Sequence, residues 1–141
     1  MGNPRLIQEH LVEEGLAGHL PQRSNLYARL VHVDGEVGDA LVLRGFGVGP
    51  GDEVIVPGYT YIATPAAVIA VGAVPVIVDI DDSLGLDPSE VERQITPHTK
   101  AIVPVHMRGV PARLNELMAV AHKHGLKVVE DCCQSVGGQY K

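Results

Sequence analysis

Short apolar runs alternate with segments of helical periodicity over most of this 141-residue chain. The predicted strands, rich in valine and isoleucine, are residues 54–56, 76–79, 101–106 and 127–130. The predicted helices between them are residues 64–71, a helix opened by residues 87–90, and residues 114–124. Strands that alternate with helices of this length indicate βαβ units, so the pattern predicts an α/β fold with a mostly parallel sheet and flanking helices.

The pattern is less regular in the first third of the chain. It predicts a helix over residues 4–20, a linker over 21–25, a strand over 27–33, a short helix over 39–46 and a turn over 49–53. We therefore divide the chain into an N-terminal helix with its linker, residues 1–25, and an α/β part, residues 26–141.

Right-handed crossovers would place the ends of four predicted strands along one edge of the sheet. These ends are Pro57, Asp79, His106 and Asp131. Ligands of open α/β sheets bind at this carboxyl edge, where an acid such as Asp131 can pair with a buried cation and Gln134 can hydrogen-bond the same ligand. The alternative is that Asp131 only caps a following helix, as aspartate often does.

Composition limits the classes of partner. The apolar fraction of 45% and charged fraction of 20% are ordinary for a folded protein, and a net charge of −6 without a basic run argues against nucleic acid or anionic membrane as partners. The longest apolar stretch, residues 66–78, is interrupted by Gly72 and Pro75 and is too short to span a bilayer. The first residues lack the apolar core of a signal peptide, so we expect a cytoplasmic protein.

The two cysteines, Cys132 and Cys133, are adjacent. Sequence neighbours rarely form a disulfide, and two thiols without further cysteine ligands make a poor zinc site. A vicinal redox pair remains an alternative, but we favour small, buried, apolar roles after a strand.

Five motifs occur in a fixed order in the last two-thirds of the chain. They are Gly49-Pro-Gly-Asp-Glu-Val-Ile-Val-Pro57, Tyr59-Thr-Tyr-Ile-Ala-Thr64, Gly72-Ala-Val-Pro-Val-Ile-Val-Asp79, Ile95-Thr-Pro-His-Thr-Lys-Ala-Ile-Val-Pro-Val-His106 and Glu130-Asp-Cys-Cys-Gln134. This series resembles the DegT/DnrJ/StrS family of pyridoxal-phosphate-dependent sugar and aminocyclitol aminotransferases, which have the aspartate-aminotransferase fold. The resemblance implies a truncated form of that family's large domain.

The resemblance implies pyridoxal phosphate as cofactor and gives four residues a role in binding it. Asp131 would pair with the pyridinium nitrogen, Gln134 would contact the side of the ring that carries the phenolic oxygen, and Tyr61 would stack on the ring face. His106 would support the site from the neighbouring strand. The alternatives are an ordinary core tyrosine at Tyr61 and a buried histidine with satisfied hydrogen bonds at His106.

The chain departs from the family at the phosphate-binding turn. An ungapped count back from Gly49 places this turn, of Ser-Gly-Thr-Ala-Ala type in the family, on residues 34–38, where Glu36 stands at the threonine position. A carboxylate about 4 Å from a phosphate costs on the order of 4 kcal/mol at an effective dielectric constant near 20. We expect weak phosphate binding at this turn.

The family's Schiff-base lysine lies well beyond the Glu-Asp-x-x-Gln motif, and Lys141 matches a residue just after Gln134 instead. Lys100, Lys123 and Lys127 fall on a strand approach and on helix or turn surfaces. Without a positioned lysine there is no base for the proton shift of transamination. We therefore expect no independent transaminase activity.

Three hypotheses for the function follow. The first is a truncated or degenerate relative of a sugar aminotransferase. The second is half of a split enzyme, completed in trans by another chain and acting on a keto-sugar or keto-cyclitol. The third is a small α/β ligand-binding or regulatory module. Because a shortened sheet would leave an unpaired edge, we expect a homo-oligomer or a heteromer with a longer homologue under all three.

Overall fold

The computed structural model describes residues 27–30 and 35–135 of the chain, with side chains from residue 38 onward. The predicted helix at 4–20 and the linker at 21–25 lie outside these residues. The described strands form one five-stranded sheet in the order β1-β5-β4-β2-β3, and every pair of neighbouring strands is parallel. They are β1 (Tyr27–Leu30), β2 (Glu53–Pro57), β3 (Val74–Val78), β4 (Thr99–Ile102) and β5 (Lys127–Asp131). The predicted α/β class with a parallel sheet is confirmed.

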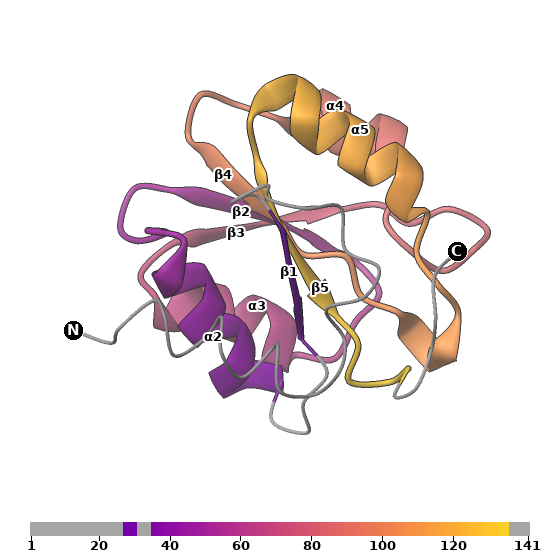
Figure 1. Ribbon diagram of the computed structural model, residues 1–141, viewed down its shortest axis with the longest axis horizontal. Helices are drawn as coiled ribbons and strands as arrows, with labels where there is room; N and C mark the ends of the chain where they lie inside the picture. The colour runs from indigo at the N-terminus through magenta and orange to yellow at the C-terminus, as the bar shows by residue number, and fades with distance from the viewer. Residues whose placement is uncertain (1–26, 31–34, 136–141) are drawn as a thin grey trace.

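Helices cover both faces of the sheet, as Figure 1 shows. They are α2 (Gly35–Gly45), α3 (Ala63–Ala70), α4 (Pro88–Gln94) and α5 (Leu114–His124), with a short 3-10 turn, η2 (Met107–Gly109). In the figure α2 and α3 lie below the sheet, and α4 and α5 lie above it. The described part of the molecule is thus a three-layer α/β structure.

Alternation along the strands separates the interior into two cores. Val54, Val56 and Val129 pack in the core between the sheet and helices α2 and α3. Ile55 and Val128 pack in the core between the sheet and helices α4 and α5. Successive side chains of a strand point to opposite faces, so a sheet covered on both faces needs continuous apolar runs. This requirement explains the runs of valine and isoleucine in the sequence.

Two helices carry clear boundary signals. At the start of α4 the side chain of Asp87 accepts a hydrogen bond from the backbone N–H of Ser89, and Pro88 occupies the first turn. At the end of α5, Gly125 adopts a left-handed conformation with φ of 68° and donates its N–H to carbonyls of the last turn. Helix α5 spans Leu114–His124, so its predicted bounds are confirmed at both ends.

Other boundaries differ from prediction. Strand β4 ends at Ile102 instead of residue 106, because Pro104 has no N–H to donate to the ladder; beyond it only Val105 forms an isolated bridge with Asp131. Helix α2 begins at Gly35, four residues before the predicted start, and its Leu43 is fully buried. Tertiary packing here outweighs the low helix propensity of glycine.

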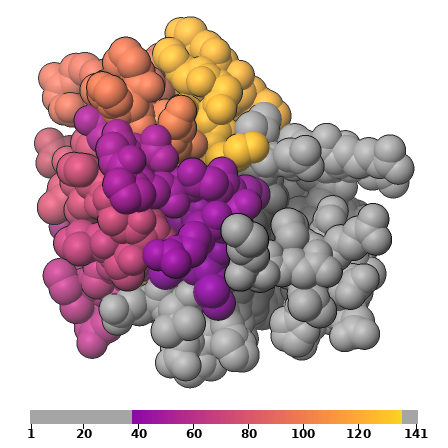
Figure 2. All heavy atoms as spheres, turned by 90° about the vertical axis from the view of Figure 1, so that its left-hand side faces the viewer, coloured from indigo at the N-terminus to yellow at the C-terminus, as the bar shows by residue number. Residues whose placement is uncertain are grey.

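Strand β3 forms one edge of the sheet, and proline protects it. The N–H of Val74 donates to the carbonyl of Asp52 toward β2, so the backbone of Pro75 faces the open edge without an N–H. The turn before β2 packs against the end of α3, since a Cβ on Gly72 (φ of 84°) would lie 3.1 Å from Pro50 Cγ. Figure 2 shows these segments as one continuous surface.

Candidate functional site

Asp131 lies at the carboxyl end of β5, on the side of the sheet that α2 and α3 cover. Its side chain is buried, and both carboxylate oxygens accept hydrogen bonds. Oδ2 accepts from the Thr64 hydroxyl at 3.3 Å, and Oδ1 accepts from the backbone N–H of Cys133 at 3.0 Å. The Thr64 hydroxyl in turn lies 2.9 Å from that of Thr60. Two elements, α3 and β5, therefore fix the orientation of this carboxylate.

Tyr61 and Gln134 lie in the segments that adjoin Asp131. Tyr61 precedes α3 by two residues and is 70% exposed, so it is not a core tyrosine. Gln134 is also exposed, and its Oε1 accepts a hydrogen bond from the backbone N–H of Arg108 at 2.8 Å. Arg108 has a φ of 54°, rare for a residue with a side chain. The Gln134 side chain thus ties the segment after β5 to η2.

His106 occupies the opposite side of the sheet from the Asp131 carboxylate. Its Nδ1 accepts a hydrogen bond from the backbone N–H of Ala112 at 2.9 Å, and its Nε2 lies 2.6 Å from Glu130 Oε1. Both partners are buried, and desolvation raises the pKa of Glu130 to about 7. With both ring nitrogens in hydrogen bonds, His106 has the contacts of a satisfied buried histidine. Its predicted role toward a cofactor stays a prediction.

His106, Glu130 and Cys132 together resemble a metal-binding cluster, because their candidate ligand atoms lie within 4.8 Å of one another. The hydrogen bonds do not fit a metal. A backbone N–H can only donate, so Nδ1 of His106 is the acceptor and the ring proton sits on Nε2, which donates to Glu130. A metal at Nε2 would need the lone pair that this proton occupies. We therefore assign no metal to the cluster.

Asp39, in the middle of α2, is a feature of the site that the sequence analysis missed. Its side chain is 1% exposed, and neither carboxyl oxygen has a hydrogen-bond partner among the described residues. Desolvation, with a further contribution from the charge of Asp131, raises the pKa of Asp39 to about 8. One signal could have revealed it: Val42 and Leu43, three and four residues on, mark the buried face of the helix.

The two cysteines also differ by side of the sheet. Cys132 is buried, and its thiol points to Glu130 with an Sγ to Oε1 distance of 3.5 Å. Burial, together with the nearby acids Asp131 and Asp39, raises the pKa of the Cys133 thiol to about 12. A thiol so reluctant to ionise is a poor nucleophile, which argues against the vicinal redox pair.

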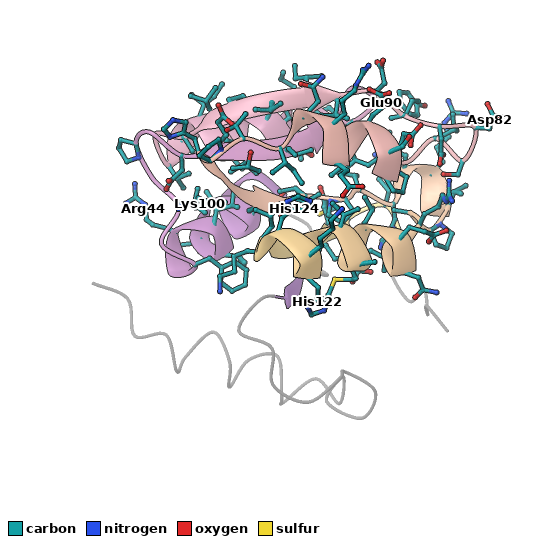
Figure 3. The ribbon with its side chains drawn as sticks, turned by 90° about the horizontal axis from the view of Figure 1, so that it is seen from above. Arg44, Asp82, Glu90, Lys100, His122 and His124 are labelled. Carbon is teal, nitrogen blue, oxygen red and sulfur yellow. The ribbon has the colours of Figure 1, made fainter. Side chains whose placement is uncertain are left out.

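The described lysines lie at the end of the sheet away from Asp131. Lys127 begins β5 and lies 5.5 Å from the centre of the Phe46 ring, and Lys123 forms an ion pair of 2.6 Å with Glu92. In Figure 3, Lys100 lies at the opposite end of the molecule from Asp82, which follows β3 at the carboxyl edge. Within residues 38–135, no lysine therefore lies at the carboxyl end of β5.

The segment aligned with the phosphate-binding turn leads into the first turn of α2. The backbone of Glu36 belongs to that turn, and its side chain lies outside the described part of the molecule. The predicted effect of this acid on phosphate binding thus stays a prediction.

None of the described helices has the length and apolar character needed to cross a bilayer.

A parallel sheet with helices on both faces and a buried acid at a strand end defines an α/β protein with a candidate ligand site at the carboxyl edge of its sheet. A profile of the DegT/DnrJ/EryC1/StrS aminotransferase family matches residues 33–141. The chain belongs to this family.

Curated relatives of this chain have the names of aminotransferases that act on sugars or cyclitols. The chain is 55% identical over 100 residues to UDP-N-acetyl-3-dehydro-alpha-D-glucosamine 3-aminotransferase of Acidithiobacillus ferrooxidans, covering 70% of this chain and 27% of the relative. It is 48% identical over 120 residues to L-glutamine:2-deoxy-scyllo-inosose aminotransferase of Streptomyces kanamyceticus, covering 82% of this chain and 28% of the relative. The chain thus spans little more than a quarter of the length of these relatives.

Solved structures agree with the fold. A putative sugar aminotransferase of Streptococcus pneumoniae, Spr1654 in its pyridoxamine phosphate form, superposes with a TM-score of 0.76 at 30% identity, covering 100% of this chain and 37% of that one. NtdA of Bacillus subtilis, with pyridoxamine phosphate bound, gives 0.72 at 40% identity, covering 74% of this chain and 24% of that one. Both of these structures contain the cofactor as pyridoxamine phosphate.

Proposed function

We propose that this chain forms the part of an aminotransferase site that holds the ring of pyridoxal phosphate, and that it does not transaminate alone. The observation that supports this most is the Asp131 carboxylate, buried at the carboxyl end of β5 and oriented by two hydrogen bonds. A carboxylate there can accept the N–H of a pyridinium ring, and the exposed ring of Tyr61 is available for stacking. When bound, pyridoxal phosphate supplies an electron sink for the carbanion of transamination.

The missing group is an amine. Lys100, Lys123 and Lys127 are described, and all three lie away from Asp131, so none can move a proton at the cofactor ring. The amine must therefore come from residues outside the described part or from another chain. Because no described lysine lies near Asp131, completion in trans by another chain is the second candidate function.

The substrate class follows from the relatives. Two of them are named for nucleotide-linked amino sugars and one for a cyclitol ketone. We propose a keto-sugar or keto-cyclitol as the substrate of the completed site. The same completion would make the working form a homo-oligomer or a heteromer with a longer homologue.

Reduction with borohydride in the presence of pyridoxal phosphate tests this proposal. Peptide mass spectrometry would locate any lysine of this chain or of an added full-length relative that has reacted with the aldehyde. We expect sparse labelling of this chain alone, and increased labelling of one lysine of the relative when both are present. Asp131→Ala should abolish that increase, because it removes the acceptor for the ring nitrogen.

A single stoichiometric adduct within this chain alone would contradict the proposal that it lacks the amine. Labelling of the relative that does not change on mixing, or that Asp131→Ala leaves intact, would instead favour a binding or regulatory module.

A further inference from the structure

Asp39 is the one carboxyl among residues 38–135 whose two oxygens are both buried without a hydrogen-bond partner. It lies on α2, which packs against β5, and its charge interacts with that of Asp131. A buried carboxylate without compensating hydrogen bonds is costly, so a buried carboxyl without partners either keeps its proton or binds a cation. The site described above therefore contains a second acid.

We propose that Asp39 is a positioning acid of the Asp131 site, which keeps its proton while the site is empty and releases it when a cationic nitrogen heterocycle binds against Asp131. The inference rests on the proposed function, since it takes the pyridinium ring as the cation. It goes further, because it couples binding at this site to the loss of one proton from a residue of α2.

The neighbours of Asp39 allow this exchange. Asp131 on β5 and the Cys133 thiol just beyond it are the ionisable groups that interact with it. Helix α3, which packs along α2, has no ionisable side chain. The hydroxyl of its Thr64 donates a hydrogen bond to Asp131. Strand β1 contains Tyr27 and Arg29, whose side chains lie outside the described part.

Charge explains the direction of the coupling. With the site empty, desolvation and the nearby Asp131 carboxylate hold the pKa of Asp39 at about 8, so the group is protonated at pH 7. A pyridinium ring against Asp131 adds one positive charge, which offsets the negative charge there and so favours the ionised form of Asp39. Binding therefore expels a proton, and the affinity for the cation increases with pH.

Calorimetry with pyridoxamine 5′-phosphate tests the coupling, because this ligand needs no lysine. Binding to the full chain would be measured at pH 7.0 in two buffers of different ionisation enthalpy, which gives the number of protons released. The wild-type chain should release up to about one proton more per ligand than Asp39→Asn, and its affinity should gain up to about tenfold per pH unit relative to that variant below pH 8. Asp82→Asn, which removes an exposed carboxyl on the loop after β3, is the matched control and should behave as the wild type.

The outcomes separate the inference from the proposed function. Binding with equal proton release in the wild type and Asp39→Asn would overturn the inference and leave the proposed function standing. No binding by the wild-type chain would overturn the proposed cofactor site, and the inference would fall with it.

A titration of the wild-type chain avoids dependence on a folded variant. Carbon-13 NMR of labelled aspartate carboxyls should show one group that titrates near pH 8 without ligand and at lower pH with pyridoxamine 5′-phosphate. If every described aspartate titrates near pH 4 without ligand, the inference is wrong.

Discussion

Two carboxyls in the described part of the chain, Asp39 and Glu130, are buried deeply enough that desolvation raises their pKa, to about 8 and about 7. They lie in different layers: Asp39 is on α2, and Glu130 faces His106 on the other side of the sheet. A raised pKa also makes the free energy of unfolding change with pH, because the folded chain then binds a proton that the unfolded chain releases. Each acid thus makes the stability of the fold depend on pH.

We expect Asp39→Asn to remove a loss of stability at alkaline pH. The folded pKa of Asp39 is about 8 against 3.8 unfolded, so its proton stabilises the fold fully below pH 3.8 and this contribution is lost as pH rises toward 8. The shift of about 4 units corresponds to on the order of 5 kcal/mol.

Urea unfolding at pH 5 and pH 9 would measure this effect. The free energy of unfolding of the wild type should fall between the two pH values by several kcal/mol more than that of Asp39→Asn. Asp82→Asn, at an exposed site, should follow the wild type. Parallel curves for all three proteins would refute the prediction.

A second prediction at this scale concerns Cys133. With its thiol pKa raised to about 12 from 9.0, the thiolate at pH 8 should be about a thousandfold less populated than in an ordinary cysteine. Alkylation by iodoacetamide, followed by peptide mass spectrometry, should be correspondingly slow in the folded chain and fast in urea. Asp131→Asn removes one nearby charge and should accelerate it. Rapid labelling of native Cys133 would disprove this.

Local signals predict an element well when the residues that bound it are themselves local. Helix α5 was predicted with its observed bounds because Gly125 ends it and its apolar spacing is regular. Strand β4 was predicted too long, since its apolar run continues past Pro104, which has no N–H to donate to the ladder. The 3-10 turn η2 was missed because nothing in its sequence signals the left-handed conformation of Arg108.

The site shows the same division. Asp131 could be found from its place after a predicted strand and from the family motifs around it. Asp39 was missed because an acid near the expected start of a helix is ordinary. Its spacing to Val42 and Leu43 indicates the buried face of α2, but only the packing of α2 on β5 brings it to the site. Likewise, His106 lies beyond the end of β4, and its contact with Glu130 places its ring away from the Asp131 carboxylate.

At the end of α5, we expect Gly125→Ala to destabilise the fold by about 1 kcal/mol. The φ of Gly125 is 68°, and an added Cβ would meet no atom within 4 Å, so the cost is that of the backbone conformation alone. Asparagine tolerates this conformation better, so Gly125→Asn should cost less. Chemical denaturation of the three proteins would test the order, and equal stability of Gly125→Ala and the wild type would contradict it.

Apolar side chains of α3 and β3 remain exposed in the described part of the chain, and they lead us to expect self-association. Ile69 on α3 and Ile77 on β3 are 63% and 67% exposed, and α3 packs against β3. Because Pro75 protects the edge of β3, we expect association on this side through these side chains and not through strands added to β3.

Light scattering at micromolar concentration would measure this association. The wild-type mass should exceed that of one 15.0 kDa chain. The double variant Ile69→Lys/Ile77→Lys should return to that mass, while Val110→Lys, on the loop after η2, should not. A monomeric wild type would show that the prediction is wrong.

Strand β5 ends in two consecutive acids that serve opposite layers: Glu130 meets His106 above the sheet, and Asp131 meets Thr64 below it. One peptide bond therefore separates two side-chain environments on opposite faces of the sheet, which share the backbone hydrogen bond from the N–H of His106 to the carbonyl of Asp131. Inserting or deleting one residue within β5 would exchange the two acids between layers and disrupt both environments at once.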